Sequence, residues 1–233
     1  MPSDAKKPAA AAAAAAKPAS SPVKNGYLIL YNAVSAALWL TVMVRTVAAT
    51  VNGGGYTSVY ATTGEFCKWT QTLAGMEVLH SLLGVVRAPF FTTFMQVFSR
   101  YAIVWGVTDQ FPGLARASPA YASMLVAWST TEVIRYSYFA LTLAAGGKPP
   151  AALHWLRYHA FFVLYPVGIS SEAWLIWRAV EPARDAVHPY YSTALFLYVV
   201  TIYPPSAYIL YTHMMTQRRK VMKAAKAQNQ KAQ

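Results

Sequence analysis

The sequence predicts an all-α membrane protein, a bundle of six transmembrane helices with disordered basic tails. Three observations support this prediction. First, 56% of the 233 residues are hydrophobic and 12% are charged, whereas a soluble domain has about 25% charged residues. Second, six apolar stretches approach the length needed to cross a bilayer, which is about 20 residues. Third, the positive charge is concentrated at the two ends of the chain.

Both ends of the chain are predicted to lie outside the membrane. Residues 1–24 are rich in Ala, Pro, Lys and Ser and lack the bulky apolar core of a signal peptide, which favours a disordered tail. Residues 218–233 form a second basic tail, and the two tails hold half of the 20 Lys and Arg residues. The basic charge therefore belongs to tails that flank a membrane domain over residues 25–217, and no nucleic-acid partner is expected.

The first three predicted spans are separated by clear breaks. The first, residues 27–49, ends before the glycine-rich turn VNGGGY. The second, residues 69–87, stops before Pro89, and the third, residues 90–108, stops at Asp109. The second and third spans are the more polar ones, and the short connection at Pro89 makes them an antiparallel pair.

The last three predicted spans are longer and more apolar. Residues 119–144 are ended by the sequence GGKPP, in which glycine and proline both interrupt a helix. Residues 153–179 form the fifth span, and residues 189–216 form the sixth, directly before the basic tail. The even number of spans places both termini on one side of the membrane.

Charge distribution gives the orientation. Loops and tails on the cytosolic side of a membrane carry an excess of Lys and Arg, so both basic tails are expected in the cytosol. Arg87, Lys148 and Arg157 fall on the same predicted side, whereas Arg178 and Arg184 fall on the opposite side and argue mildly against this orientation.

Several charged side chains fall inside the predicted spans, where they are rare and usually face a bundle interior or a cavity. They are Arg45, Glu77, Arg100, Glu132, Arg135 and Glu172. Arg45 is close enough to a span end to extend to the interface. Glu132 and Arg135 are three residues apart and can pair on one helix face. These charges form either a structural ion-pair network or part of a functional site, and the sequence leaves both interpretations open.

Glu172 stands out because the fifth span has no other charge between Arg157 and Arg178. A carboxylate at the centre of a transmembrane helix costs roughly 2.5–3.5 kcal/mol on insertion scales. A cationic partner such as Arg100 or Arg135, a bound proton, or water in a cavity must offset that cost. Each of these conditions is compatible with a proton-transfer group, and an ion pair is also compatible with a purely structural role.

The residues that precede Glu172 suggest a shaped site. Tyr158, Tyr165 and Glu172 are spaced by two helical turns and lie near one face, with Gly168 leaving space between the last two. Pro166 removes a helical hydrogen bond and predicts a kink at that position. A phenol, a gap and a carboxylate on one face are typical of an acid–base site, although a Tyr in a membrane helix is more often a packing residue.

The sequence offers little for metal or redox chemistry. Cys67 is the single cysteine, which excludes an intrachain disulfide and a multi-cysteine metal site. The five histidines do not form the clustered boxes of a membrane di-iron oxygenase. We therefore expect no metal and no redox cofactor.

Three motifs resemble a known family. EVLHSLLGVVRAP, WSTTEVIRYSYFA and WLRYHAFFVLYPVGISSE occur in this order between Tyr27 and Gln217. They are similar to the very-long-chain (3R)-3-hydroxyacyl-CoA dehydratases, also called the protein-tyrosine-phosphatase-like or PASTICCINO2 type. The name does not imply phosphatase chemistry here, because Cys67 lies outside these motifs and outside any Cys-x5-Arg loop.

The resemblance implies a six-spanning lyase of the endoplasmic reticulum membrane. Such an enzyme removes water from a 3-hydroxyacyl-CoA to give a trans-2-enoyl-CoA, the third step of fatty-acid elongation. It needs no cofactor apart from the CoA of its substrate. Its expected partners are the lipid bilayer, a condensing elongase, a 3-ketoacyl-CoA reductase and an enoyl-CoA reductase. A dilysine retrieval signal is not evident, because Gln230 precedes Lys231.

The same resemblance assigns functional residues. The catalytic Tyr and Glu of the family correspond to Tyr165 and Glu172. The other functionally important positions of its motifs correspond to Glu77, Arg100, Glu132, Arg135, Arg157 and Gly168. Dehydration needs a base for the proton on C2 and an acid for the leaving hydroxyl. We favour Glu172 as base and Tyr165 as acid, although the reverse pairing also fits the sequence.

Other interpretations make different predictions. A small proton-coupled transporter would use Glu172 and Glu132 as a relay, but the chain lacks the repeated, broken-helix pattern of that class. A membrane scaffold would hold the same charges in structural ion pairs. For the dehydratase, Arg135, Arg157 or Lys148 are candidates to bind the CoA phosphates or to polarise the thioester carbonyl.

Overall fold

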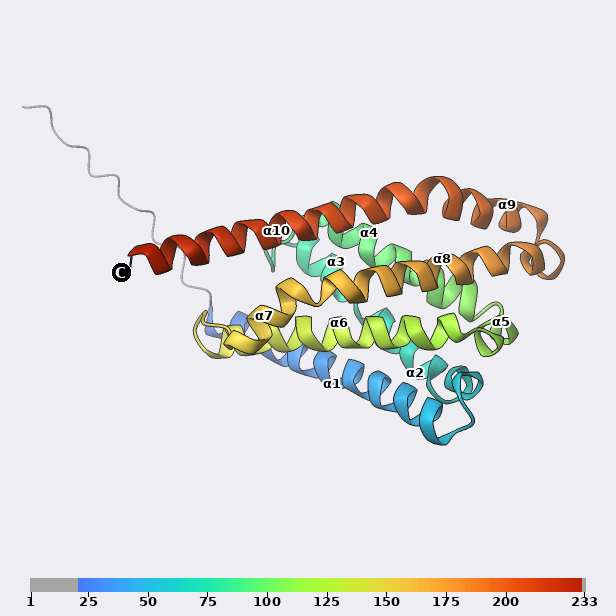
Figure 1. The fold of residues 1–233 in the computed structure, drawn as a ribbon, viewed down its shortest axis with the longest axis horizontal. Coiled ribbons are helices and arrows are strands. Elements are labelled where there is room, and N and C mark those ends of the chain that lie inside the picture. Colours follow the sequence, from blue (N-terminus) through green and yellow to red (C-terminus); the bar gives the residue numbers. More distant parts are fainter. Residues whose placement is uncertain (1–20, 232–233) are drawn as a thin grey trace, which may run out of the picture.

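The computed structural model describes residues 21–231, and every regular element in this range is helical (Figure 1). The elements group into six helical legs that run back and forth along the long axis of the molecule. In chain order the legs are α1 (Pro22–Asn52); α2 (Val59–Leu73) with α3 (Gly75–Leu82); α4 (Phe90–Tyr101) with η2 (Ala102–Thr108); α6 (Pro119–Ala144); α7 (Ala151–His159) with α8 (Phe161–Ala186); and α9 (Pro189–Leu197), η3 (Tyr198–Ile202) and α10 (Tyr203–Lys231). Two short helices, η1 (Tyr56–Ser58) and α5 (Pro112–Ala117), lie in the connections.

The predicted helical stretches correspond to these legs, with one clear shift. The second leg begins at Val59, ten residues before the expected start at 69. The segment from Val59 to Lys68 is polar enough to resemble a loop in sequence, yet Val59 and Cys67 are buried in the core. Tertiary packing therefore extends this helix beyond its apolar stretch.

The hydrophobic core is concentrated at the end of the molecule remote from the termini. Helix α6 lies between α1 and α8 and packs against both. Trp39 of α1, Leu125 of α6 and Ile176 of α8 are almost completely buried in this core. Toward the other end, where the described chain begins and ends, α4 packs against α2 and α3, whereas α10 packs against α7 and α8. The separation of α4 from α10 leaves space inside that half.

The fifth leg is bent, but not at the expected residue. α7 and α8 meet at Ala160 with an angle of 45°, whereas the helix is continuous through Pro166. The amides of Val163 and Leu164 both bond to the carbonyl of Ala160, which marks a tightened turn just before the proline. Since the ring of a proline crowds the preceding turn, the distortion is displaced toward the N-terminus of Pro166.

Two helices of the described chain are long and apolar enough to cross a membrane, α1 and the continuous helix from Pro189 to Ala224. The bent pair α7–α8 makes a third if it counts as one span. The sixth leg does not end with its apolar stretch, because α10 continues as a helix to Lys231. The expected disorder of residues 218–231 is therefore wrong: this segment has no Gly or Pro and is rich in Lys, Arg, Ala and Gln, which favour helix. Residues 1–20 of the expected N-terminal tail lie outside the described range, and its last residues form the start of α1.

Candidate functional site

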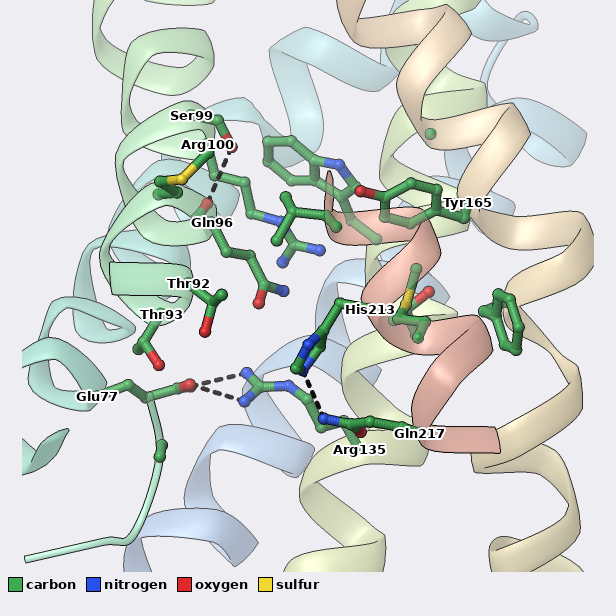
Figure 2. Close-up of a pocket in the computed structure, with 18 of the residues that line it drawn as sticks. Glu77, Thr92, Thr93, Gln96, Ser99, Arg100, Arg135, Tyr165, His213 and Gln217 are labelled. Carbon is green, nitrogen blue, oxygen red and sulfur yellow. Dashed lines mark hydrogen bonds and ion pairs between the residues drawn. The ribbon is translucent and has the colours of Figure 1, made fainter. Parts of the chain in front are cut away.

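A cavity of about 900 Å³ occupies the half of the molecule near the termini (Figure 2). Its walls come from α4, α6, α8 and α10, with contributions from α1, α3 and α7. It reaches from Glu172, near the middle of α8, to the connection at Arg87–Pro89 before α4. Tyr158, Tyr165, Gly168 and Glu172 all line it, so the face inferred from their spacing is confirmed.

Glu172 is buried at the inner end of the cavity and is held by two neutral donors. The indole Nε1 of Trp128 donates to Oε1 at 2.7 Å, and the hydroxyl of Tyr203 donates to Oε2 at 2.8 Å. Among the described residues no Lys, Arg or His lies within ion-pair distance of this carboxylate. The alternative of an ion pair with Arg100 or Arg135 is thus wrong, because both guanidinium groups are bound to other carboxylates.

Tyr165 lies in the same cavity without a strong protein partner. Its hydroxyl is 3.5 Å from the carbonyl oxygen of Ala207, at the limit of a hydrogen bond, and its ring stacks on Tyr211 with centroids 5.6 Å apart. No hydrogen bond joins it to Glu172, so the phenol and the carboxylate stand apart. The phenolic proton is therefore available to a third group.

Gly168 leaves space in the cavity beside Glu172. A Cβ atom at this position would lie 3.9 Å from Oε1 of Glu172 and 3.8 Å from the Cβ of Ala127. A methyl group at position 168 would thus contact Glu172 and Ala127, and a larger side chain would fill the space beside them. The missing side chain therefore leaves room in the cavity beside the carboxylate of Glu172.

A network of ion pairs forms another wall of the cavity. Arg135 binds Glu77 through two N–H···O bonds of 2.7 Å and donates from Nε to Glu132 at 2.6 Å. Arg100 binds the other oxygen of Glu132, and the hydroxyl of Tyr136 donates to Glu77. The predicted pair of Glu132 and Arg135 is confirmed. Two arginines and two glutamates balance one another, which satisfies the requirement for buried charges to be paired.

Arg157 differs from these arginines because no carboxylate of the described chain lies within 4 Å of it. Its guanidinium lies 4.7 Å from the ring centroid of Tyr138 and 4.4 Å from that of Phe139, and it lines the cavity. Its buried Nε has no hydrogen-bond partner in the structure. Lys148 does not line the cavity. Arg157 is therefore a cation at the cavity wall whose charge is not neutralised by a neighbouring carboxylate.

Trp128 and Tyr203 are the site residues that the sequence did not reveal. Trp128 is the first residue of the motif that contains Glu132. Its position one helical turn before a charged residue is the only feature of the sequence that suggests a role in the site. Tyr203 is followed by two prolines at the start of α10 and resembles a packing residue. Both become recognisable only through their contact with Glu172.

Comparison with known proteins gives a consistent result. The family model described as protein tyrosine phosphatase-like protein, PTPLA, matches residues 71–224. A probable very-long-chain (3R)-3-hydroxyacyl-CoA dehydratase of Schizosaccharomyces pombe is 42% identical over 207 residues, covering 88% of this chain and 97% of the relative. PASTICCINO 2A of Oryza sativa is 36% identical, covering 89% and 97%, and dehydratase 2 of Mus musculus is 35% identical, covering 88% and 84%. Both also bear the name very-long-chain (3R)-3-hydroxyacyl-CoA dehydratase.

No solved structure is detectably similar to this chain. The family match covers well over half of the residues and includes Glu77, Arg100, Glu132, Arg135, Arg157, Tyr165, Gly168 and Glu172. The relatives are matched over almost the whole described chain. The protein therefore belongs to the protein tyrosine phosphatase-like, or PTPLA, family.

Proposed function

We propose that this protein is a very-long-chain (3R)-3-hydroxyacyl-CoA dehydratase, a hydro-lyase that forms a trans-2-enoyl-CoA. The names of its relatives support this activity. The observation that carries the proposal is the arrangement of Tyr165 and Glu172, which line one cavity but do not bond to each other. An acid and a base that are separated by a gap suit the removal of a proton and a hydroxyl from neighbouring carbons.

In this mechanism Glu172 removes the proton from C2 of the substrate. The electron pair of the C2–H bond forms the C2–C3 double bond, and the C3–O bond breaks. Tyr165 donates its proton to the departing hydroxyl, which leaves as water. Transfer of the proton from Glu172 back to Tyr165 through water restores the enzyme. The neutral donors Trp128 and Tyr203 support this assignment because they orient the carboxylate without cancelling its charge.

We assign to Arg100 the stabilisation of the negative charge that develops on the thioester oxygen. Its guanidinium stacks over Trp128 at 4.7 Å from the ring centroid and lines the cavity. Within the described chain only one of its nitrogens is hydrogen-bonded, to Glu132, whereas every guanidinium nitrogen of Arg135 is engaged. Donors fixed in advance toward a developing oxyanion are an effective source of catalysis.

Arg157 is the better candidate to bind the CoA phosphates. Arg135 already binds two carboxylates, so its positive charge is compensated and it would bind a further anion weakly. Arg157 lies at the cavity wall with no such partner, and a guanidinium binds phosphate oxygens well. No cofactor beyond the CoA of the substrate is needed for this reaction.

We further propose that all six legs cross the membrane of the endoplasmic reticulum, with both termini in the cytosol. The second, third and fourth legs carry the polar cavity wall, so their composition is less apolar than that of a simple span. Large apolar side chains such as Trp69 of α2 and Trp174 of α8 are exposed, do not line the cavity and suit contact with lipid. The elongase and the two reductases of the elongation cycle are the expected partners of its third step.

The test is turnover by the full chain, purified in detergent, with a very-long-chain 3-hydroxyacyl-CoA. We expect Tyr165→Phe and Glu172→Gln each to lower kcat by about 10²- to 10⁴-fold, the contribution of a positioned acid or base. The matched control is Tyr208→Phe, which changes an exposed tyrosine of α10. Full activity in both site variants would refute the site assignment, and no formation of enoyl-CoA by the wild type would refute the dehydratase.

A further inference from the structure

Helix α4 contributes side chains of two chemical kinds to the cavity. Phe90, Phe94 and Phe98 stack in a row with centroids 6.0 and 5.8 Å apart, and each is more than 40% exposed. Thr92, Gln96 and Ser99 follow one another by four and three residues and line the cavity. Phe94 and Phe98 also line the cavity, so α4 contributes aromatic rings as well as hydroxyl and amide groups to this wall.

The opposite wall of this part of the cavity is also polar. His213 and Gln217 come from α10 and bond to each other at 2.6 Å. Figure 2 shows Gln96 and His213 pointing into the cavity from opposite sides, with Thr92 on the same helix as Gln96. The polar stripe of α4 runs about 10 Å, seven residues of helix, from Thr92 to Ser99, and Figure 2 shows Ser99 beside Arg100, with Tyr165 on the opposite side of the cavity.

Gln96 is the side chain in this stripe that most clearly needs a partner. It is half-buried, and its amide makes no hydrogen bond to another described residue. Thr92 donates to the carbonyl of Pro89, which leaves the lone pairs of its hydroxyl oxygen available. A primary amide offers both donors and an acceptor, so its natural complement is another amide.

We propose that Thr92, Gln96 and His213 bind the pantetheine arm of the acyl-CoA substrate. This arm is the uncharged chain between the thioester and the nucleotide, and it contains two amides and a hydroxyl group. The hydroxyl, amide and imidazole groups of these three residues match it, because they offer donors and acceptors to the amides and the hydroxyl group of the arm. The inference rests on the proposed dehydratase function and adds a subsite to it: the arm follows α4 and brings the thioester to Tyr165 and Glu172.

The experiment compares three thioesters of one 3-hydroxyacyl chain, carried by CoA, by pantetheine and by N-acetylcysteamine. N-Acetylcysteamine keeps the amide nearest the sulfur and lacks the remainder of the arm, whose second amide and hydroxyl group are the groups assigned to this subsite. For Gln96→Leu we expect kcat/KM to fall about tenfold with CoA and pantetheine, mainly through KM, and to stay unchanged with N-acetylcysteamine. Thr92→Val should show the same pattern with a smaller loss.

The matched control is Phe90→Leu, an exposed residue of the same helix that does not line the cavity, which should behave as the wild type with all three thioesters. An equal loss with all three thioesters, or a loss with CoA alone, would overturn the pantetheine subsite. If the wild type converts none of them, the dehydratase function itself fails, which is a distinguishable result. Elution as a single species in size-exclusion chromatography shows that each variant is folded.

Discussion

At the scale of single residues, Glu172 shows what a sequence can and cannot reveal about a buried charge. Its isolation in an apolar stretch marks it as unusual, and its spacing from Tyr165 and Gly168 places all three on one face. Its partners, Trp128 and Tyr203, lie 44 residues before it and 31 residues after it. Contacts over such separations depend on helix packing, which periodicity alone does not determine.

Tyr203 is predicted to position Glu172 rather than to touch the substrate. Tyr203→Phe keeps the ring but removes the donor to Oε2, so the carboxylate loses one of its two fixed contacts. Since a hydrogen bond to a charged group contributes about 1.5–3 kcal/mol, we expect kcat to fall roughly tenfold or more, with KM little changed. Turnover of the 3-hydroxyacyl-CoA measures this change.

Isotopic substitution separates positioning from a merely structural role. If the base is misaligned, cleavage of the C2–H bond limits the rate more strongly, and deuterium at C2 should slow Tyr203→Phe more than it slows the wild type. Tyr208→Phe, an exposed tyrosine of the same helix, serves as control. An unchanged kcat and isotope effect in Tyr203→Phe would show that the Tyr203 hydroxyl does not position the base.

At the scale of elements, ion pairs replace apolar packing where the bundle is hollow. Glu77 of α3, Arg100 of α4 and the pair Glu132–Arg135 of α6 connect three helices beside the cavity. The sequence predicted the pair within α6 because three residues separate its members. The links to α3 and α4 were not predictable, since they require the relative placement of three helices.

Arg135→Met should destabilise the protein strongly. The substitution removes the cation shared by Glu77 and Glu132 and leaves buried carboxylates with reduced compensation. Breaking a buried ion pair in this way costs about 3–5 kcal/mol, which a thermal unfolding experiment in detergent will detect as a lower Tm. The control is Arg45→Met, whose more exposed guanidinium lies over the ring of Phe66. Equal Tm values for Arg135→Met and the wild type would mean that the network contributes nothing to stability.

Helix boundaries and bends were predicted less well than the helices themselves. The start of α2 was missed because Val59 and Cys67 are buried through contacts with other helices. The bend was placed at Pro166 because proline removes a hydrogen bond, whereas the strain is relieved at Ala160, in the preceding turn. In both cases the local sequence identified the region in which the helix starts or bends, whereas packing against other helices determined the exact residue.

At the scale of the whole molecule, the chain divides into a packed end and a hollow end. Residues such as Trp39, Leu125 and Ile176 fill the end remote from the termini, while the cavity occupies the other end. The six helical stretches were predictable from composition and breaks. The cavity was not, because it arises from the separation of α4 and α10 rather than from any one segment.

The proposed crossing of all six legs makes a prediction that distinguishes it from two or three crossings. Thr57, after α1, and Lys148, after α6, lie in exposed connections at opposite ends of the bundle. Six crossings place Thr57 in the lumen and Lys148 in the cytosol. If only α1, α7–α8 and the last leg crossed the membrane, no crossing would lie between Thr57 and Lys148. Both positions would then be on the same side of the membrane.

Thiol labelling in sealed microsomes measures this difference. Thr57→Cys and Lys148→Cys are introduced singly into the Cys67→Ala variant. Cys67 is buried in the core and is replaced so that it contributes no labelling of its own. We expect a membrane-impermeant maleimide to label Lys148→Cys in intact vesicles and Thr57→Cys only after the membrane is permeabilised. Labelling of both positions under the same condition would contradict the six crossings. Because the proposed CoA-phosphate site at Arg157 is on the same side as Lys148, labelling of both positions only after permeabilisation would also place the cavity mouth away from cytosolic acyl-CoA.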